Sequence, residues 1–364
     1  MLLVTFHGGG SGGTKNVYCY SDSGGTPVST AVLADAPSGV LDQLRAMVAF
    51  QPYADSNFNL YVVVGSSSGS VLAFTGPPWT GSAFNYLGMM IGAGESIMHP
   101  FGVVFASDQT CYVSNQDSNV VAQVNLSPAS GGGYLEGSLA SGCQSPYLTG
   151  KYPSPKNAFL DGTFVASHVG ELAGISLKNI PDVHHKDGGL GVDGSGKPLK
   201  PSNSVRDVAI ANNILFVCDE ADSQVNMYNL SSSPTLGTFL GSASVSGKRK
   251  PTHLAIQGSG IWVSADDKLY WGTLPSSPQS PSLSLSEVAI TVPSGNKVGG
   301  ISFDTIGNVY VLFQDGTHTT GTGSIWTYSV QAGSPPTLSG GQSIVTGLPD
   351  TPEFCLWIPV GSAP

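Results

Sequence analysis

Residues 103–126, VVFASDQTCYVSNQDSNVVAQVNL, decide the fold class of this chain. β-Branched and aromatic residues fill three short runs, VVFA, TCYVS and VVAQVNL, which is the composition of β-strands. Turn-forming polar residues separate the runs, with Ser-Asp-Gln in the first gap and Asn-Gln-Asp-Ser-Asn in the second. The stretch therefore predicts an antiparallel meander of three strands.

The same pattern returns at residues 208–230, VAIANNILFVCDEADSQVNMYNL. Aligned on the middle strands, Tyr112-Val113-Ser114-Asn115 falls on Phe216-Val217-Cys218-Asp219. Further copies start near residues 47, 158, 254 and 301, and most carry a fourth apolar run, such as FNYLGMM or EVAITV. The starting points are 46 to 56 residues apart. A four-stranded unit repeated at such a spacing predicts the blades of a β-propeller.

The two ends of the chain supply one more unit in two pieces. FCLWIPV, residues 354–360, has the composition of a first strand, whereas LLVTFHGG and NVYCYSD near the N-terminus have that of second and third strands. Pairing the ends in one sheet closes a ring and removes its open edges. We therefore expect an all-β chain that is a single domain over 1–364, a seven-bladed β-propeller. Blade 1 is shared between 354–360 and 1–35, and the other blades start near 47, 103, 158, 208, 254 and 301.

Composition excludes several classes of partner. Only 10% of the residues are charged, the net charge is −10, and the Lys and Arg residues are dispersed, which disfavours nucleic acid and anionic membranes. No apolar run approaches the roughly 18 residues of a membrane span. A monomer that binds a small molecule is the expectation that remains.

The N-terminus and the cysteines bear on the compartment. MLLVTFHGGG has no basic segment before its apolar residues, so no signal peptide is predicted, and the chain is expected to be cytoplasmic, or secreted with its signal already removed. The five cysteines are an odd number without paired spacing, and four of them lie in predicted strands. They are expected to be buried free thiols.

The repeats resemble a known family of propellers. VSNQDSNVVAQVNL and VCDEADSQVNMYNL, together with the strand starts VRDVAI and PTHLAI, are similar to the repeats of NHL and YVTN-type propellers. That superfamily includes streptogramin lyase, the lyase of peptide amidation, lactonases of the gluconolactonase and paraoxonase kind, strictosidine-synthase-like proteins and interaction scaffolds. The resemblance implies the architecture, and it leaves the activity open because one fold hosts many functions.

Blade geometry predicts where a site would lie. In each blade the first strand starts, and the second strand ends, on the same face of the ring, so residues at these places from all blades converge at the mouth of the central channel. Many of the chain's few ionisable residues occupy these positions. The candidate catalytic residues are His7, His99, His168, His253, Asp207, Asp219 and Glu220. The candidate substrate-binding residues are Arg45, Arg206, Asn115, Asp266, Gln314 and Glu353.

Two chemistries suit such a cluster. In the first, His99, His168 and His253, with His7 nearby, hold a divalent ion such as zinc, an arrangement that the resemblance to lyase propellers implies. In the second, no cofactor is needed: a histidine acts as general base, an acid such as Asp207, Asp219 or Glu220 orients it, and an arginine holds an anionic group of the substrate. The calcium site of the lactonase relatives is matched only weakly in this sequence, by Glu353, Asn115 and Asp219.

These patterns favour a propeller enzyme, a hydrolase of the lactonase type or a lyase, acting on a small molecule. The alternative is a non-catalytic propeller that binds a glycan or a protein partner on the same face. The motif Gly65-Ser66-Ser67-Ser68-Gly69 matches a serine-hydrolase elbow, but a strand rather than the required helix is predicted after it. Residues 182–204 interrupt the repeat and are expected to form either a surface loop or a lid.

Overall fold

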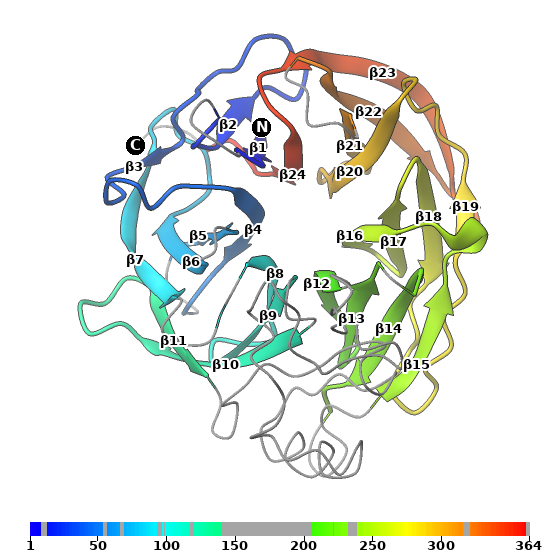
Figure 1. Ribbon diagram of the computed structural model, residues 1–364, viewed down its shortest axis with the longest axis horizontal. Helices are drawn as coiled ribbons and strands as arrows, with labels where there is room; N and C mark the ends of the chain where they lie inside the picture. Colours follow the sequence, from blue (N-terminus) through cyan, green and yellow to red (C-terminus); the bar gives the residue numbers. More distant parts are fainter. Residues whose placement is uncertain are drawn as a thin grey trace, which may run out of the picture.

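The computed structural model describes residues 1–8, 13–53, 57–65, 69–92, 97, 99–116, 120–139, 205–220, 222–231, 239–315 and 321–361. Their strands form six antiparallel sheets set around a central axis, which is the architecture of a β-propeller (Figure 1). The prediction of an all-β propeller with four-stranded blades is confirmed. A 3-10 turn, η3 (Ser246–Lys248), accompanies the strands.

Each blade runs from an inner strand at the axis to an outer strand at the rim. From inside outward, the first blade comprises β24 (Pro352–Trp357), β1 (Leu2–Phe6) and β2 (Tyr18–Tyr20). The second comprises β4 (Leu44–Phe50), β5 (Asn59–Val64), β6 (Ser70–Thr75) and β7 (Phe84–Gly92), with the short β3 (Leu33–Ala34) added in parallel to β7.

The remaining four blades follow in chain order. One comprises β8 (Pro100–Phe105), β9 (Thr110–Asn115), β10 (Val120–Pro128) and β11 (Leu135–Leu139), and the next comprises β12 (Val205–Ala211), β13 (Ile214–Asp219), β14 (Gln224–Asn229) and β15 (Phe239–Ser244). The following blade comprises β16 (Pro251–Gln257), β17 (Gly260–Ala265), β18 (Lys268–Thr273) and β19 (Ser286–Val288). The last comprises β20 (Asn296–Phe303), β21 (Asn308–Asp315), β22 (Gly323–Gln331) and β23 (Thr337–Leu348).

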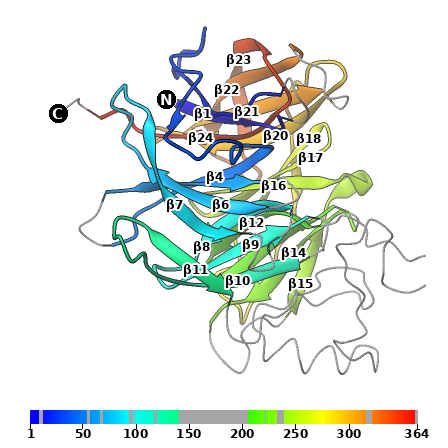
Figure 2. The ribbon, with the colours of Figure 1, turned by 60° about the vertical axis from the view of Figure 1, so that its left-hand side comes forward.

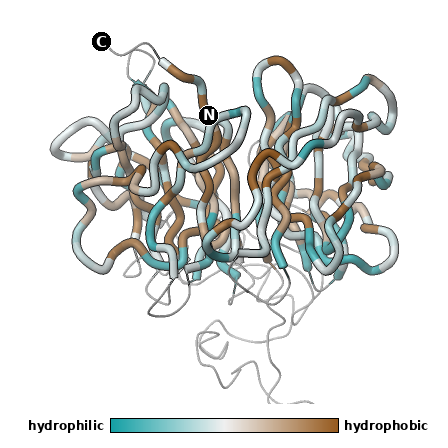
Figure 3. The backbone as a smooth tube through the Cα atoms, turned by 90° about the horizontal axis from the view of Figure 1, so that it is seen from above, coloured by the Kyte–Doolittle hydropathy of each residue, from teal (hydrophilic) through white to brown (hydrophobic). Residues whose placement is uncertain are grey.

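The second strands of the blades are buried on both faces. All residues of β5, NLYVVV, and of β13, ILFVCD, are buried because another blade packs on each side. A continuous apolar run, rather than an alternating one, is the sequence form of such a strand. Hydrophobic segments accordingly run through the strands, and hydrophilic ones gather in the loops (Figure 3). Cys19, Cys111, Cys218 and Cys355 are buried free thiols, as predicted.

One apolar cluster fills each interface between neighbouring blades of the described chain, giving six in all. The cluster around Tyr112, Val208 and Leu215 joins the β8–β11 blade directly to the β12–β15 blade. The described residues therefore form a closed ring of six blades, and the predicted count of seven is not confirmed. The unit predicted to start near residue 158, like residues 182–204, lies outside the described residues.

The ends of the chain close the ring. β24 pairs antiparallel with β1, with Val4 opposite Cys355 and Leu2 opposite Trp357, and the N-terminal amine donates a hydrogen bond to the carbonyl of Ile358 at 3.1 Å. Figure 2 shows the two strands side by side. The predicted closure is confirmed. No helix among the described residues is long and apolar enough to cross a membrane.

Each inner strand has an irregularity near its start, and this feature positions the site. In β4, Leu44 lies opposite Val64 and Met47 opposite Val62, so two residues on β4 face one on β5. The same register shift occurs in β8, β12 and β20, and shifts of one residue occur in β16 and β24. Such β-bulges re-aim side chains away from the regular pleat.

Candidate functional site

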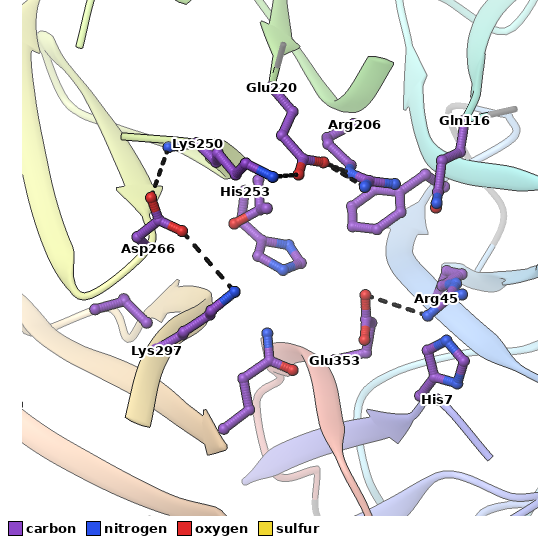
Figure 4. A pocket seen from close by; sticks show the side chains of 14 residues that line it. His7, Arg45, Gln116, Arg206, Glu220, Lys250, His253, Asp266, Lys297 and Glu353 are labelled. Carbon is purple, nitrogen blue, oxygen red and sulfur yellow. Dashed lines mark hydrogen bonds and ion pairs between the residues drawn. The ribbon is translucent and has the colours of Figure 1, made fainter. Parts of the chain in front are cut away.

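A polar pocket of about 230 Å³ lies where the six inner strands begin (Figure 4). Eight residues predicted from the sequence line it: His7, Arg45, Arg206, Glu220, His253, Asp266, Gln314 and Glu353. Phe101, Gln116, Lys250, Thr252, Lys297 and Val298 complete its lining.

The bulges of the inner strands supply much of this lining. The first extra residue of the bulge is Arg45 in β4, Phe101 in β8 and Arg206 in β12, and each of them lines the pocket. Thr252 and Glu353 are the extra residues of β16 and β24, and they line it too. Because the bulge occurs at the same level in every blade, these side chains meet around the axis.

The charge of the pocket is opposite to that of the whole chain. Its charged lining consists of four cations, Arg45, Arg206, Lys250 and Lys297, against three carboxylates, whereas the chain has a net charge of −10. A cleft whose charge opposes that of its protein concentrates ligands of the matching sign. The pocket is therefore suited to an anion.

Arg45 and Glu353 form the buried part of this charge set. Nη1 of Arg45 lies 3.2 Å from Oε1 of Glu353, and both side chains are almost fully buried. Nη2 of Arg45 lies 3.3 Å from Nε2 of His99, and its guanidinium stacks on the Phe101 ring at 5.8 Å. Burial opposes the ionisation of Glu353, but Arg45, with smaller contributions from nearby histidines and Arg206, lowers its pKa below the usual value. The Glu353 carboxylate is therefore ionised at neutral pH.

Gly65 provides the space for this arginine. A side chain at position 65 would place its Cβ 2.8 Å from Nε and 2.9 Å from Cγ of Arg45. Real Cβ contacts are essentially never that short, so a larger residue here would displace the guanidinium.

His253 is the most unusual group of the pocket. It is 1% exposed, and neither ring nitrogen has a hydrogen-bond partner within the described structure. Its ring lies between the aromatic rings of Phe101 and Phe354, with centroids 5.4 and 5.7 Å away. Burial lowers the pKa of His253 to about 4, and the Glu353 carboxylate opposes that shift. Because buried polar atoms without partners are costly, these two nitrogens are suited to bind water or a ligand in the pocket.

The other cations of the pocket are paired at its rim. Glu220 bridges Arg206 and Lys250: its Oε2 accepts from Arg206, and its Oε1 lies 3.2 Å from Nζ of Lys250. Asp266 accepts the backbone N–H of Lys250 at 3.0 Å and lies 3.9 Å from Nζ of Lys297. Figure 4 shows these pairs around the opening.

Four of the predicted site residues that the structure describes lie outside the pocket lining. His99 contacts Arg45, so it adjoins the site through that side chain. Asn115 donates to the carbonyl of Val113 at 3.2 Å. Asp219 accepts from the backbone of Asp222 and from Nδ2 of Asn226, which shapes the turn after β13. His168 lies outside the described residues.

Asp207, the fourth, connects blades. Its Oδ1 accepts the N–H of Val208 at 2.9 Å, and its Oδ2 accepts the N–H of Leu254 from the neighbouring blade at 3.0 Å. The structure places it in an interface rather than beside His253 in the pocket lining, because the second residue of a bulge points away from the first. Gly102 makes room for it, since a Cβ there would lie 2.6 Å from Oδ1.

Asp207 should make stability depend on pH. Burial raises its pKa to about 7, although the two N–H donors oppose the shift. The folded protein therefore holds this proton more tightly than the unfolded chain, so the contribution is full below about pH 4 and is lost as pH rises through 7. Between these values the loss should be at most about 1.4 kcal/mol per pH unit. Denaturant unfolding at pH 5 and pH 8 should show a decline that is absent in Asp207→Asn; an equal decline in both would contradict this.

One histidine of the predicted metal set, His168, lies outside the described residues. Within the part of the chain that the structure describes, no group of three His, Cys, Asp or Glu side chains could hold a metal ion. For the calcium alternative, Glu353 is paired with Arg45, and Asn115 and Asp219 make the turn contacts described above. These three residues do not fit a calcium ion, and no step below depends on a metal.

Two lysines that line the pocket, Lys250 and Lys297, were not among the residues predicted from the sequence. Lys250 belongs to the basic run 248–250, which has the local character of a solvated turn, yet it immediately precedes β16 and reaches Glu220. Lys297 is absent from the predicted site because the repeat pattern places the start of this blade near Ile301, whereas β20 begins at Asn296. The signal for both was their position at the start of an inner strand.

Comparisons with known proteins support the fold. No family model and no curated protein matches the chain. Among solved structures, a protein from Lactobacillus plantarum is similar with a TM-score of 0.54 and 13% identity, over 94% of this chain and 82% of that one. Candidate 6-phosphogluconolactonases from Bacteroides fragilis and Bacteroides uniformis have TM-scores of 0.52 and 0.50, each at 13% identity, over 94% of this chain and 81% and 82% of theirs. The likeness shows the propeller fold.

Proposed function

We propose that the pocket hydrolyses the lactone ring of a small molecule that carries an anionic group. The observation that carries this proposal is His253, a buried histidine whose two nitrogens lack partners, in a pocket with an excess of cationic side chains. The solved neighbours described as candidate 6-phosphogluconolactonases support the choice of a lactone.

In this reaction His253 acts as a general base. It accepts a proton from water while the water oxygen attacks the lactone carbonyl carbon. The C–O bond of the ring then breaks, and the imidazolium returns its proton to the leaving oxygen, so the products are a hydroxyl and a carboxylic acid on one molecule. N–H groups of Arg45 stabilise the negative charge that develops on the carbonyl oxygen.

The low pKa of His253 is compatible with this role. At neutral pH the imidazole is unprotonated and able to accept a proton, although a base with a pKa of about 4 is a weak one. An anionic substrate bound beside it favours the protonated form and raises its pKa. Substrate binding thus strengthens the base that the reaction needs.

A lactone panel tests the proposal. Purified protein would be given 6-phosphogluconolactone and, as the uncharged comparison, glucono-δ-lactone, and proton release would be followed with an indicator in weak buffer. We expect ring opening of the phosphorylated lactone at least roughly 100-fold above the spontaneous rate, the scale of general-base catalysis, and a smaller effect on the uncharged one. Binding of both lactones without turnover would instead support the non-catalytic binding propeller.

A further inference from the structure

Glu220 occupies the place in the pocket where an anionic ligand would bind. Its carboxylate contacts an arginine and a lysine at once, Arg206 through one oxygen and Lys250 through the other at 3.2 Å. All three residues line the pocket, and the side chains of Glu220 and Arg206 are each 14% exposed. A carboxylate held between a guanidinium and an ammonium is also how proteins bind the carboxylate or phosphate group of a ligand.

The other pairs of the pocket differ from this one. Arg45 and Glu353 also line the pocket, but their side chains are less exposed than those of Arg206 and Glu220. Lys297 lies 3.9 Å from Asp266, against 3.2 Å between Lys250 and Glu220, so its contact is the looser of the two. Glu220 is therefore the carboxylate that holds the two cations best placed to receive an anion from solvent.

We infer that Glu220 is an internal counter-ion that competes with the ligand for Arg206 and Lys250. This inference rests on the proposed function in assigning the pocket to an anionic substrate. Because Glu220 is part of the chain, its carboxylate competes with a free ligand as if it were present at about millimolar concentration. A singly charged ligand offers Arg206 and Lys250 little that Glu220 does not already supply.

The competition selects for charge. A phosphate monoester carries close to two negative charges and three acceptor oxygens at neutral pH, so it interacts with the cations more strongly than one carboxylate does. When it binds, Glu220 releases Arg206 and Lys250, which then contact the phosphate. The pocket thereby rejects simple carboxylates and accepts multiply charged anions.

Binding of inorganic phosphate tests the inference without relying on turnover. Isothermal titration at pH 7 and constant ionic strength would compare wild type with Glu220→Gln. Loss of the competing charge should tighten phosphate binding roughly tenfold, since like charges near a bound anion oppose it. The matched control is Glu287→Gln, because Glu287 pairs with Lys268 at 2.7 Å on a surface away from the pocket and should leave phosphate affinity unchanged.

Two further variants assign the effect to this place. Glu220→Asp, with a shorter side chain, should fall between wild type and Glu220→Gln, and adding Arg206→Gln to Glu220→Gln should remove the gain. Weaker or unchanged phosphate binding by Glu220→Gln, in a protein that still unfolds cooperatively, would overturn the inference, because Glu220 would then be orienting the cations. If the affinity rises but no lactone is opened, the inference stands and the proposed hydrolysis fails.

Discussion

His253→Phe is expected to lower kcat/KM for the lactone by about 10²- to 10⁴-fold, the usual contribution of a general base. The same change should leave the free energy of unfolding within about 1.5 kcal/mol of wild type, because one flat ring replaces another between Phe101 and Phe354. The phenylalanine also removes two buried nitrogens that have no hydrogen-bond partner. Kinetics and denaturant unfolding of the same variant together separate a chemical role from a packing role.

The pH dependence gives a second measure of His253. In wild type, kcat/KM should fall as pH drops through about 4, where the free imidazole becomes protonated. Its folded pKa is below the usual value near 6.5, so the unfolded chain binds more protons between these limits and wild type loses stability on acidification. His253→Phe should lack that component of the loss. A variant that unfolds much more easily at pH 7 but keeps its turnover would contradict the assignment.

Arg45→Met is expected to lower the free energy of unfolding by about 3–5 kcal/mol, because it leaves the buried Glu353 carboxylate without its nearest cation. Turnover should fall as well, since the guanidinium lines the pocket. Adding Glu353→Met should recover part of the lost stability, as removing both charges is less costly than removing one. Urea unfolding of the single and double variants measures the difference.

The surface pair Arg249 and Asp267 is the control for this prediction. Its side chains are 35% and 44% exposed, against 3% and 10% for Arg45 and Glu353. Arg249→Met should therefore cost at most about 1 kcal/mol. Equal losses from Arg45→Met and Arg249→Met would show that burial of the inner pair does not matter.

The fold could be predicted from the sequence because each blade repeats the same apolar runs and turns. The strand around Val113 and that around Val217 are buried between blades, and burial on both faces leaves an unbroken apolar signature. The predicted count of seven blades is not confirmed, because the unit predicted at residues 158–177 lies outside the described residues. Among the described residues, the sheets β8–β11 and β12–β15 are in direct contact.

The sequence predicts the height along the propeller axis at which the site lies, but it does not predict which side chains at that height line the pocket. Arg206 and Asp207 are neighbours in one bulge, yet the first lines the pocket and the second bonds to the next blade. A strand start identifies the level, whereas the bulge decides which of the two side chains faces the axis. Lys250 shows the same limit, because the partner that draws it to the pocket, Glu220, is thirty positions earlier in the chain.

The bulges of the inner strands have a consequence for how this protein can change. The first extra residue of a bulge is left out of the regular pairing and, where it carries no charge, makes no ion pair that the fold depends on. Thr252 and Gly299 occupy such positions and carry no charge. Evolution can therefore alter the specificity of the pocket one blade at a time while the scaffold is conserved, and an engineer can use the same positions.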